Sequence, residues 1–279
     1  MLGPDSLTWK YLGDRRLLFF LHRTGTLQNM HPAVAAVLLE HSDFFDDPYD
    51  RFARSIPHIL GVVYDAPSDA TGVRVRDFHR GLGATDHAGR RWHALEPRVF
   101  YWTHATFVEM IVAMTDAFGR PLTLPEKDRL IAESVAWWQR YGMTDRVVEA
   151  HDWASFEAYW NRMLATDLER NAVTNFAFSD GRHHPAPPGA PEHLWKLLAG
   201  PVDSSSRWMS NALMPERARE ILGLEWTRAD QAVFDTFRAT VRRTWPLVPP
   251  ALRYAPRAQA GMRRARASTS QPAAAAPAR

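Results

Sequence analysis

The stretch PRVFYWTHATFVEMIVAM (residues 97–114) carries the apolar spacing that decides the fold class. Large side chains recur three or four residues apart along it, with one histidine inside the series. The series consists of Phe100, His104, Phe107, Ile111 and Met114. This spacing places them on one face of an α-helix that packs into a core. We expect the helix to begin at about Pro97 and to end near Phe118.

The rest of the chain shows the same period, without internal repeats or strand-like alternation. A helix is predicted to begin at Pro48 with Asp47 as its cap, and another after a Ser68 cap, stopping at Gly81 and Gly83. Residues 84–96 predict a small hairpin or ordered loop. Further helices are expected at 125–141, after Asp152, and at 191–199, 203–222 and 227–245. The sequence therefore predicts an all-α, multi-helix single domain over residues 1–266, followed by a disordered tail over 267–279.

Composition narrows the class of protein. With 279 residues and 46% hydrophobic content, the chain is long enough for a sizeable core. The absence of cysteine excludes disulfides, thiolate metal sites and cysteine nucleophiles, and it fits a reducing compartment. No apolar run has the length of a transmembrane segment, and the opening residues do not resemble a signal peptide. We expect a soluble cytoplasmic protein.

The charge is distributed unevenly. Nine of the 34 basic residues, all arginines, lie after Asp235 and no acidic residue does, which leaves 25 basic and 31 acidic residues in 1–235. A solvated helix face with a tail is the favoured interpretation of the basic end, because no aromatic platform for specific nucleic-acid binding accompanies it. Contact of this end with an acidic surface stays open.

Several catalytic motifs are missing from the sequence. There is no H-E-x-x-H, no glutamate three residues before a histidine, no G-x-S-x-G and no P-loop. These absences exclude zincin helices, ferritin-like di-iron pairs, and the hydrolase and nucleotide-binding signatures. The segment GLGATD lacks the third glycine of a dinucleotide fingerprint.

One helix presents a polar face. Arg51, Arg54, Ser55 and His58 lie at positions i, i+3, i+4 and i+7, so they share that face. The proline at position 57 should kink the helix and free a carbonyl. Such a face suits a pocket for an anionic or polarised ligand, but spacing alone favours a solvent-facing stripe paired with nearby aspartates.

Two histidines lie within apolar surroundings. His104 belongs to the stripe described above, where a core hydrogen bond satisfies an imidazole as well as a metal does, and the core interpretation is favoured. His79 has Val75 and Leu82 about one turn away on either side, so it also points inward. From spacing alone, whether His79 packs or binds a ligand stays open.

The order of several segments resembles a known family. GDRRLLFF, HPAVAAVLLEHSDFFDDPYDRFARS, VRVRDFHRGLGATDHAGRRWHALEPRVFYWTHATFVE and ILGLEW…PLVPPALRYAP are similar to segments of the oxygenase-MpaB/rubber-oxygenase (latex-clearing protein) family. The resemblance spans about residues 10–265 and is most specific between His31 and Glu109.

The resemblance implies a haem b cofactor in a globin-like helical core, with a histidine bound to the iron and dioxygen as co-substrate. His79 matches the iron ligand, and His104 is the alternative axial or neighbouring residue. Arg51, Arg54 and Ser55 match an arginine, lysine and threonine near the cofactor, so they are the candidate catalytic residues, and Arg51 a cofactor contact. Arg54 departs from the pattern, because a guanidinium stays protonated and cannot readily coordinate iron. Glu40 is offset from the family's glutamate, so that role is not carried over.

The sequence analysis thus predicts a haem b-dependent oxygenase that uses dioxygen on a small or medium apolar molecule, such as an alkene or prenyl chain. Polyisoprene is not expected, because the export signal of the secreted rubber oxygenases is missing. Two alternatives remain open: a haem-binding sensor or carrier without turnover, and a cofactor-free helical interaction protein of the same fold.

Overall fold

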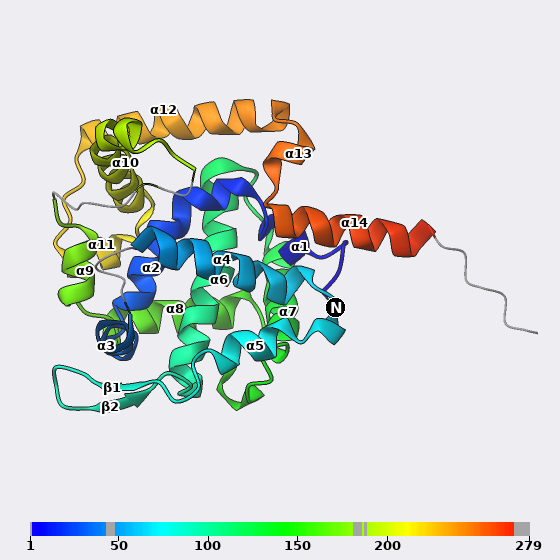
Figure 1. The fold of residues 1–279 in the computed structure, drawn as a ribbon, viewed down its shortest axis with the longest axis horizontal. Coiled ribbons are helices and arrows are strands. Elements are labelled where there is room, and N and C mark those ends of the chain that lie inside the picture. Colours follow the sequence, from blue (N-terminus) through cyan, green and yellow to red (C-terminus); the bar gives the residue numbers. More distant parts are fainter. Residues whose placement is uncertain (1, 43–47, 181–185, 187–188, 271–279) are drawn as a thin grey trace, which may run out of the picture.

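The computed structural model describes residues 2–42, 48–180, 186 and 189–270, except for the side chains of 48–52 and 268–270. Within these ranges the chain forms α-helices, short 3₁₀ helices and one small hairpin, which confirms the predicted all-α class (Figure 1). The first helices are α1 (Leu7–Tyr11), α2 (Leu21–Asn29), α3 (Pro32–His41), α4 (Pro48–Tyr64), α5 (Thr71–Asp77), α6 (Pro97–Phe118) and α7 (Leu124–Gln139). The later ones are α8 (Trp153–Thr166), α9 (Ala172–Ala177), α10 (Glu192–Leu213), α11 (Glu216–Leu222), α12 (Arg228–Thr244), α13 (Pro250–Arg253) and α14 (Pro256–Ser270). The 3₁₀ helices are η1 (Arg15–Phe20), η3 (Pro67–Asp69), η4 (Asp145–Val147) and η5 (Trp245–Leu247).

Helix α6 is the centre of the core. It begins at Pro97 and ends at Phe118, as the sequence predicts, and Phe100, His104, Ile111 and Met114 of its stripe are buried. Helices α2, α7 and α12 pack against it, and Figure 1 shows α6 passing through the middle of the molecule. The stripe predicted from spacing is therefore the surface on which the other helices assemble.

Helices α4 and α5 differ in part from expectation. Helix α4 begins at Pro48 and continues through the proline at position 57, while the expected Asp47 cap lies outside the described residues. The predicted Ser68 cap of α5 is wrong, because Ser68 lies in a 3₁₀ turn and the residue before α5, Ala70, adopts a left-handed conformation with φ 50°. The helix also ends at Asp77 instead of at the glycines.

The predicted hairpin is present. Strand β1 (Gly83–Thr85) pairs antiparallel with β2 (Arg91–His93), and both pack against α3. The Asp86 carboxylate holds the turn, because it accepts bonds from the backbone amides of Ala88 and Arg90 and from the Trp92 indole N–H at 2.8 Å. These bonds hold its pKa well below the usual range, although burial opposes them as the largest single influence.

The C-terminal part corrects another prediction. Instead of helices at 191–199 and 203–222, one helix, α10, continues through Pro201, and α11 follows it. Proline leaves the carbonyl four residues earlier without its helical donor, and here that residue, Leu197, is 74% exposed, so water can solvate the carbonyl. Helix α14 reaches Ser270, and residues 271–279 lie outside the described part.

Several C-terminal arginines bind other parts of the chain. Arg257 forms a two-pronged ion pair with Asp65 at the end of α4, and Arg264 donates to the Tyr64 carbonyl at 2.9 Å. Arg242 donates to the Asp116 carbonyl, joining α12 to α6. Through these bonds, the arginines of the basic end hold α12 and α14 against the rest of the fold. Among the described helices, none combines the length and hydropathy that a membrane-spanning segment needs.

Candidate functional site

A cavity of about 570 Å³ lies between α2, α4, α6 and the turn that follows α5. Its volume is within the range of about 300–1,000 Å³ that is typical of small-molecule sites. Phenylalanine and aliphatic side chains form much of its wall, and polar groups interrupt them. The apolar and aromatic lining residues are Leu21, Val34, Ile56, Ile59, Val75, Phe78, Phe100, Phe107 and Tyr141. A space of this shape favours an apolar ligand held by a few polar contacts.

His79 lines this cavity from the turn after α5. Its backbone amide donates to the Arg76 carbonyl, three residues earlier, at 3.0 Å. A bond over three residues makes a tighter turn than the four-residue bonds of an α-helix, and it lies directly after the end of α5. The imidazole is half-buried and stands edge-on to Phe100, with ring centroids 5.5 Å apart. Its Nδ1 lies 2.9 Å from the Val75 carbonyl, so Nδ1 carries a proton and donates it. In the neutral ring, Nε2 then bears the lone pair.

Helix α4 supplies the polar face that the sequence predicts. Arg54, Ser55 and His58 all line the cavity, and Arg54 and His58 are exposed at its outer side. The His58 ring meets Phe78 edge to face at 5.3 Å. Arg51 belongs to the same helix, but its side chain lies outside the described residues. The face is therefore shared between cavity and solvent.

His104 lines the cavity from α6 and is only 2% exposed. Its Nε2 lies 3.2 Å from the Ser134 carbonyl on α7, and the rings of Trp137, Trp138 and Tyr141 surround it. Burial lowers its pKa to about 3, so the imidazole is neutral at physiological pH. Its Nδ1 has no hydrogen-bond partner among the described residues.

Helix α2 contributes a wall that the sequence analysis missed. Thr24, Gln28 and Asn29 line the cavity, and the Gln28 amide donates to Thr106 Oγ1 at 2.8 Å. The only local signal is the four-residue spacing of Thr24 and Gln28, which is common on solvated helices. Their place at the cavity follows from the packing of α2 on α6.

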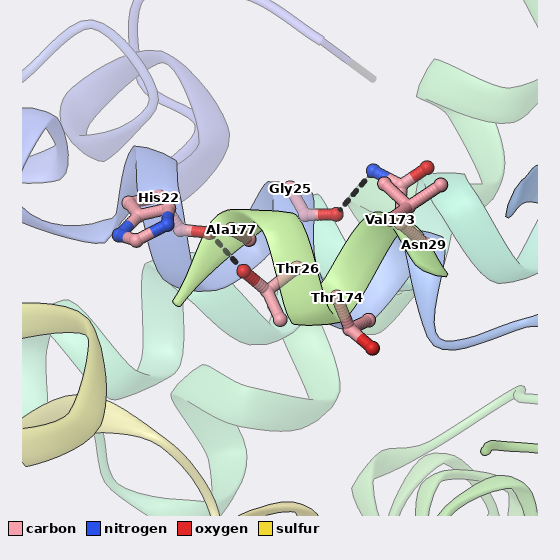
Figure 2. Close-up of a pocket in the computed structure, with 7 residues that line it drawn as sticks. All are labelled: His22, Gly25, Thr26, Asn29, Val173, Thr174 and Ala177. Atoms are coloured by element: carbon pink, nitrogen blue, oxygen red, sulfur yellow. Dashed lines mark hydrogen bonds between the residues drawn. The ribbon is translucent and has the colours of Figure 1, made fainter. Parts of the chain in front are cut away.

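A second, much smaller pocket lies on another side of α2, against α9 (Figure 2). Its volume of about 20 Å³ suits one water molecule. Asn29 and Gly25 line both spaces, and the Asn29 amide donates to the Gly25 carbonyl at 2.7 Å. This pocket is too small for a substrate.

Four of the predicted site residues thus line one cavity: Arg54, Ser55, His79 and His104. Their roles stay predictions. In the described ranges no three His, Cys, Asp or Glu side chains gather as ligands of a bare metal ion. A macrocycle that brings its own nitrogen ligands needs only one imidazole from the protein.

A family model described as ER-bound oxygenase mpaB/B'/rubber oxygenase, catalytic domain, matches residues 9–243. The chain belongs to this family. The match confirms the resemblance seen in the sequence and supports a general oxygenase role, with dioxygen and a small molecule as reactants. Comparisons with curated proteins and with solved structures find no match.

Proposed function

We propose that this member of the MpaB/rubber-oxygenase family is a haem b-dependent oxygenase whose iron is held by His79. The observation that carries the proposal is the orientation of the His79 ring. The Val75 carbonyl holds Nδ1, which fixes the tautomer with the lone pair on Nε2. Histidine ligands of metals commonly use their second nitrogen in this way.

The cavity fits a flat, largely apolar group. It holds about 570 Å³, and Phe100 and Phe107 of α6 and Val75 of α5 line it. Aromatic and aliphatic walls exclude water from such a group. His79 lines the same space, so a ligand seated there has an imidazole within its wall.

His79 suits iron ligation better than His104 does. His104 directs Nε2 to the Ser134 carbonyl, which leaves Nδ1 as its remaining nitrogen. Nδ1 is bonded to Cγ, the ring carbon that connects to Cβ and the main chain. A broad planar group that approaches Nδ1 therefore meets the backbone of the same residue. His79 has the opposite arrangement, with Nδ1 tied to the backbone and the less hindered Nε2 bearing the lone pair.

When bound, haem supplies the activation of dioxygen, and the protein supplies orientation and electrostatics. The Arg54 guanidinium is permanently protonated, so it can pair with a carboxylate of the cofactor or stabilise negative charge that develops on a reactant. The Ser55 hydroxyl, one position further along α4, can donate or accept a hydrogen bond. The apolar wall excludes bulk water and orients an apolar substrate.

An absorption spectrum of the purified protein with haem supplied tests the proposal. We expect a Soret band at one haem per chain, and at least a tenfold loss of haem affinity in His79→Ala. His58→Ala is the matched control, because it removes another imidazole of the same cavity, and we expect it to retain haem. Added imidazole should restore a ligated spectrum in His79→Ala.

Three outcomes would count against the proposal. Absence of a stoichiometric Soret band in the wild-type protein rules out the haem function. A larger loss of haem in a His104 variant than in His79→Ala means that the ligand assignment is wrong. Stable haem binding without substrate-dependent oxygen consumption points to a carrier or sensor.

A further inference from the structure

Buried polar atoms without partners mark the wall of the large cavity. Among the described residues, the hydroxyl of Thr24, the amide oxygen of Asn29 and Nδ1 of His104 are buried, lack a hydrogen bond and belong to cavity-lining side chains. Buried polar groups in folded proteins are nearly always hydrogen-bonded, so each such atom needs a partner. Asn29 also lines the small pocket in Figure 2, so its oxygen is not specific to the large cavity. Thr24 and His104 remain.

The free nitrogen of His104 can only accept a hydrogen bond. Its Nε2 faces a carbonyl oxygen, that of Ser134, so the ring proton must reside there. Burial keeps the ring from taking a second proton, with a pKa of about 3. Nδ1 therefore presents a lone pair, and its partner must be an O–H or N–H donor.

Among the described residues, no side chain supplies that donor. The Trp137 ring stands edge to face against His104 with centroids 4.8 Å apart, but its indole N–H interacts with the Tyr141 side chain, and no hydrogen bond reaches His104 Nδ1. Trp138 and Tyr141 complete an aromatic surround. In such an environment a single hydrogen bond is strengthened, and a missing one is costly.

Thr24 provides a second polar contact from the facing helix. Its side chain is 2% exposed, and its hydroxyl can both donate and accept. Gln28, one turn further along α2, donates to Thr106 and to the Thr103 carbonyl on either side of His104 in α6. These bonds fix the two helices against each other at this part of the cavity wall.

We infer that the cavity selects apolar substrates that carry one hydroxyl group, and that this hydroxyl donates to His104 Nδ1. Thr24 offers a second contact to a polar atom of the ligand. A pure hydrocarbon would leave both groups unpaired, which is how a site built for a polar group rejects its apolar analogue. The inference names the substrate class for the proposed function and rests on the use of this cavity as its substrate site.

Two substitutions separate recognition from structure at His104. His104→Gln places an amide near the Nε2 position, so it keeps a donor for Ser134 and removes the acceptor at Nδ1. His104→Asn places its amide near Nδ1, so it keeps an acceptor there and loses the bond to Ser134. Equilibrium dialysis of the protein as purified measures binding of 4-butylphenol and of 4-butyltoluene, in which a methyl group replaces the hydroxyl.

We expect the wild-type protein to bind the phenol about tenfold more tightly than the toluene, the effect of one hydrogen bond in a buried site. That ratio should fall to near one in His104→Gln and persist in His104→Asn. Thr24→Val should reduce it, whereas Thr115→Val should not. Thr115 is the matched control, since it is equally buried in α6, does not line the cavity, and its hydroxyl bonds to Val112.

Equal affinities for the two probes, no binding of either, or a ratio that survives in His104→Gln would overturn the inference. Dialysis can be run on the protein with and without bound haem, so a protein without a Soret band that still prefers the phenol keeps the inference and loses the haem function. A protein with a normal Soret band that binds the phenol and the toluene equally keeps the haem function and loses the inference.

Discussion

Removing the negative charge of Glu109 should strongly destabilise the fold. Arg23 on α2 donates from Nη1 and Nη2 to the two Glu109 oxygens at 2.5 and 2.7 Å, and from Nε to the Leu213 carbonyl at 2.9 Å. The Arg23 side chain is only 2% exposed, so Glu109→Gln leaves its charge buried without a counterion. Breaking such a pair costs about 3–5 kcal/mol. Since Glu109 is itself 14% exposed, we expect about 3 kcal/mol, or a fall in Tm of roughly 6–12 °C in thermal melts followed by circular dichroism.

An exposed ion pair of similar length is the control. Arg162 Nη2 lies 2.6 Å from Glu149 Oε2, but both side chains are nearly half exposed, so Glu149→Gln should cost less than about 1 kcal/mol. Adding Arg23→Met to Glu109→Gln removes the stranded charge and should recover part of the loss. If Glu109→Gln melts within about 2 °C of Glu149→Gln, burial does not set the strength of this pair and the reasoning fails.

Two further predictions concern the elements around the cavity. Burial lowers the pKa of His31 to about 4, below the value of about 6.5 expected in the unfolded chain. The folded state therefore binds fewer protons than the unfolded state between these values, so the stability that the neutral, buried His31 contributes is complete above about pH 6.5 and is lost as the pH falls toward 4. His31→Asn keeps an acceptor for the Ala33 amide and should reduce the loss of unfolding free energy between pH 7 and 5 by about 2 kcal/mol in urea titrations; an unchanged slope contradicts this. Gly72→Ala should cost about 1–3 kcal/mol in the same assay, because its methyl group would overlap the Arg140 carbonyl at the end of α7. In Gly3→Ala the new methyl group meets no atom within 4 Å beyond the adjacent residues, so this substitution should be nearly neutral, and equal effects of the two substitutions would refute the packing argument.

The sequence predicts those elements whose determinants are local. Both ends of helix α6 are predicted correctly, because a proline marks its first position and a continuous apolar stripe marks its length. The hairpin follows from turn residues held by Asp86. The Ser68 cap fails because the preceding proline starts a 3₁₀ turn, in which Asp69 bonds back to the Ala66 amide. A helix cap at Ser68 and a 3₁₀ turn are both compatible with these residues, and residue spacing does not show which of the two is more stable.

The site depends on contacts that spacing does not contain. The polar face of α4 is compatible with solvent or with a cavity, and the structure shows both, with Ser55 half-buried and Arg54 exposed. Thr24 stands out only when α2 is placed beside α6, because its significance is an unpaired hydroxyl in a buried wall. Periodicity predicts that His104 is buried, but the identity of its bonded nitrogen requires α7.

The ion pair and the cavity are linked through adjacent residues. Arg23 and Thr24 are neighbours on α2, but Arg23 bonds to Glu109, outside the cavity lining, while Thr24 lines the cavity. Gln28 holds the same two helices together one turn further along. The buried pair and the amide therefore fix how α2 sits on α6, and with it the separation between the Thr24 hydroxyl and His104. A site that distinguishes a hydroxyl from a methyl group needs polar atoms at fixed positions, and here that rigidity comes from contacts that the ligand does not touch.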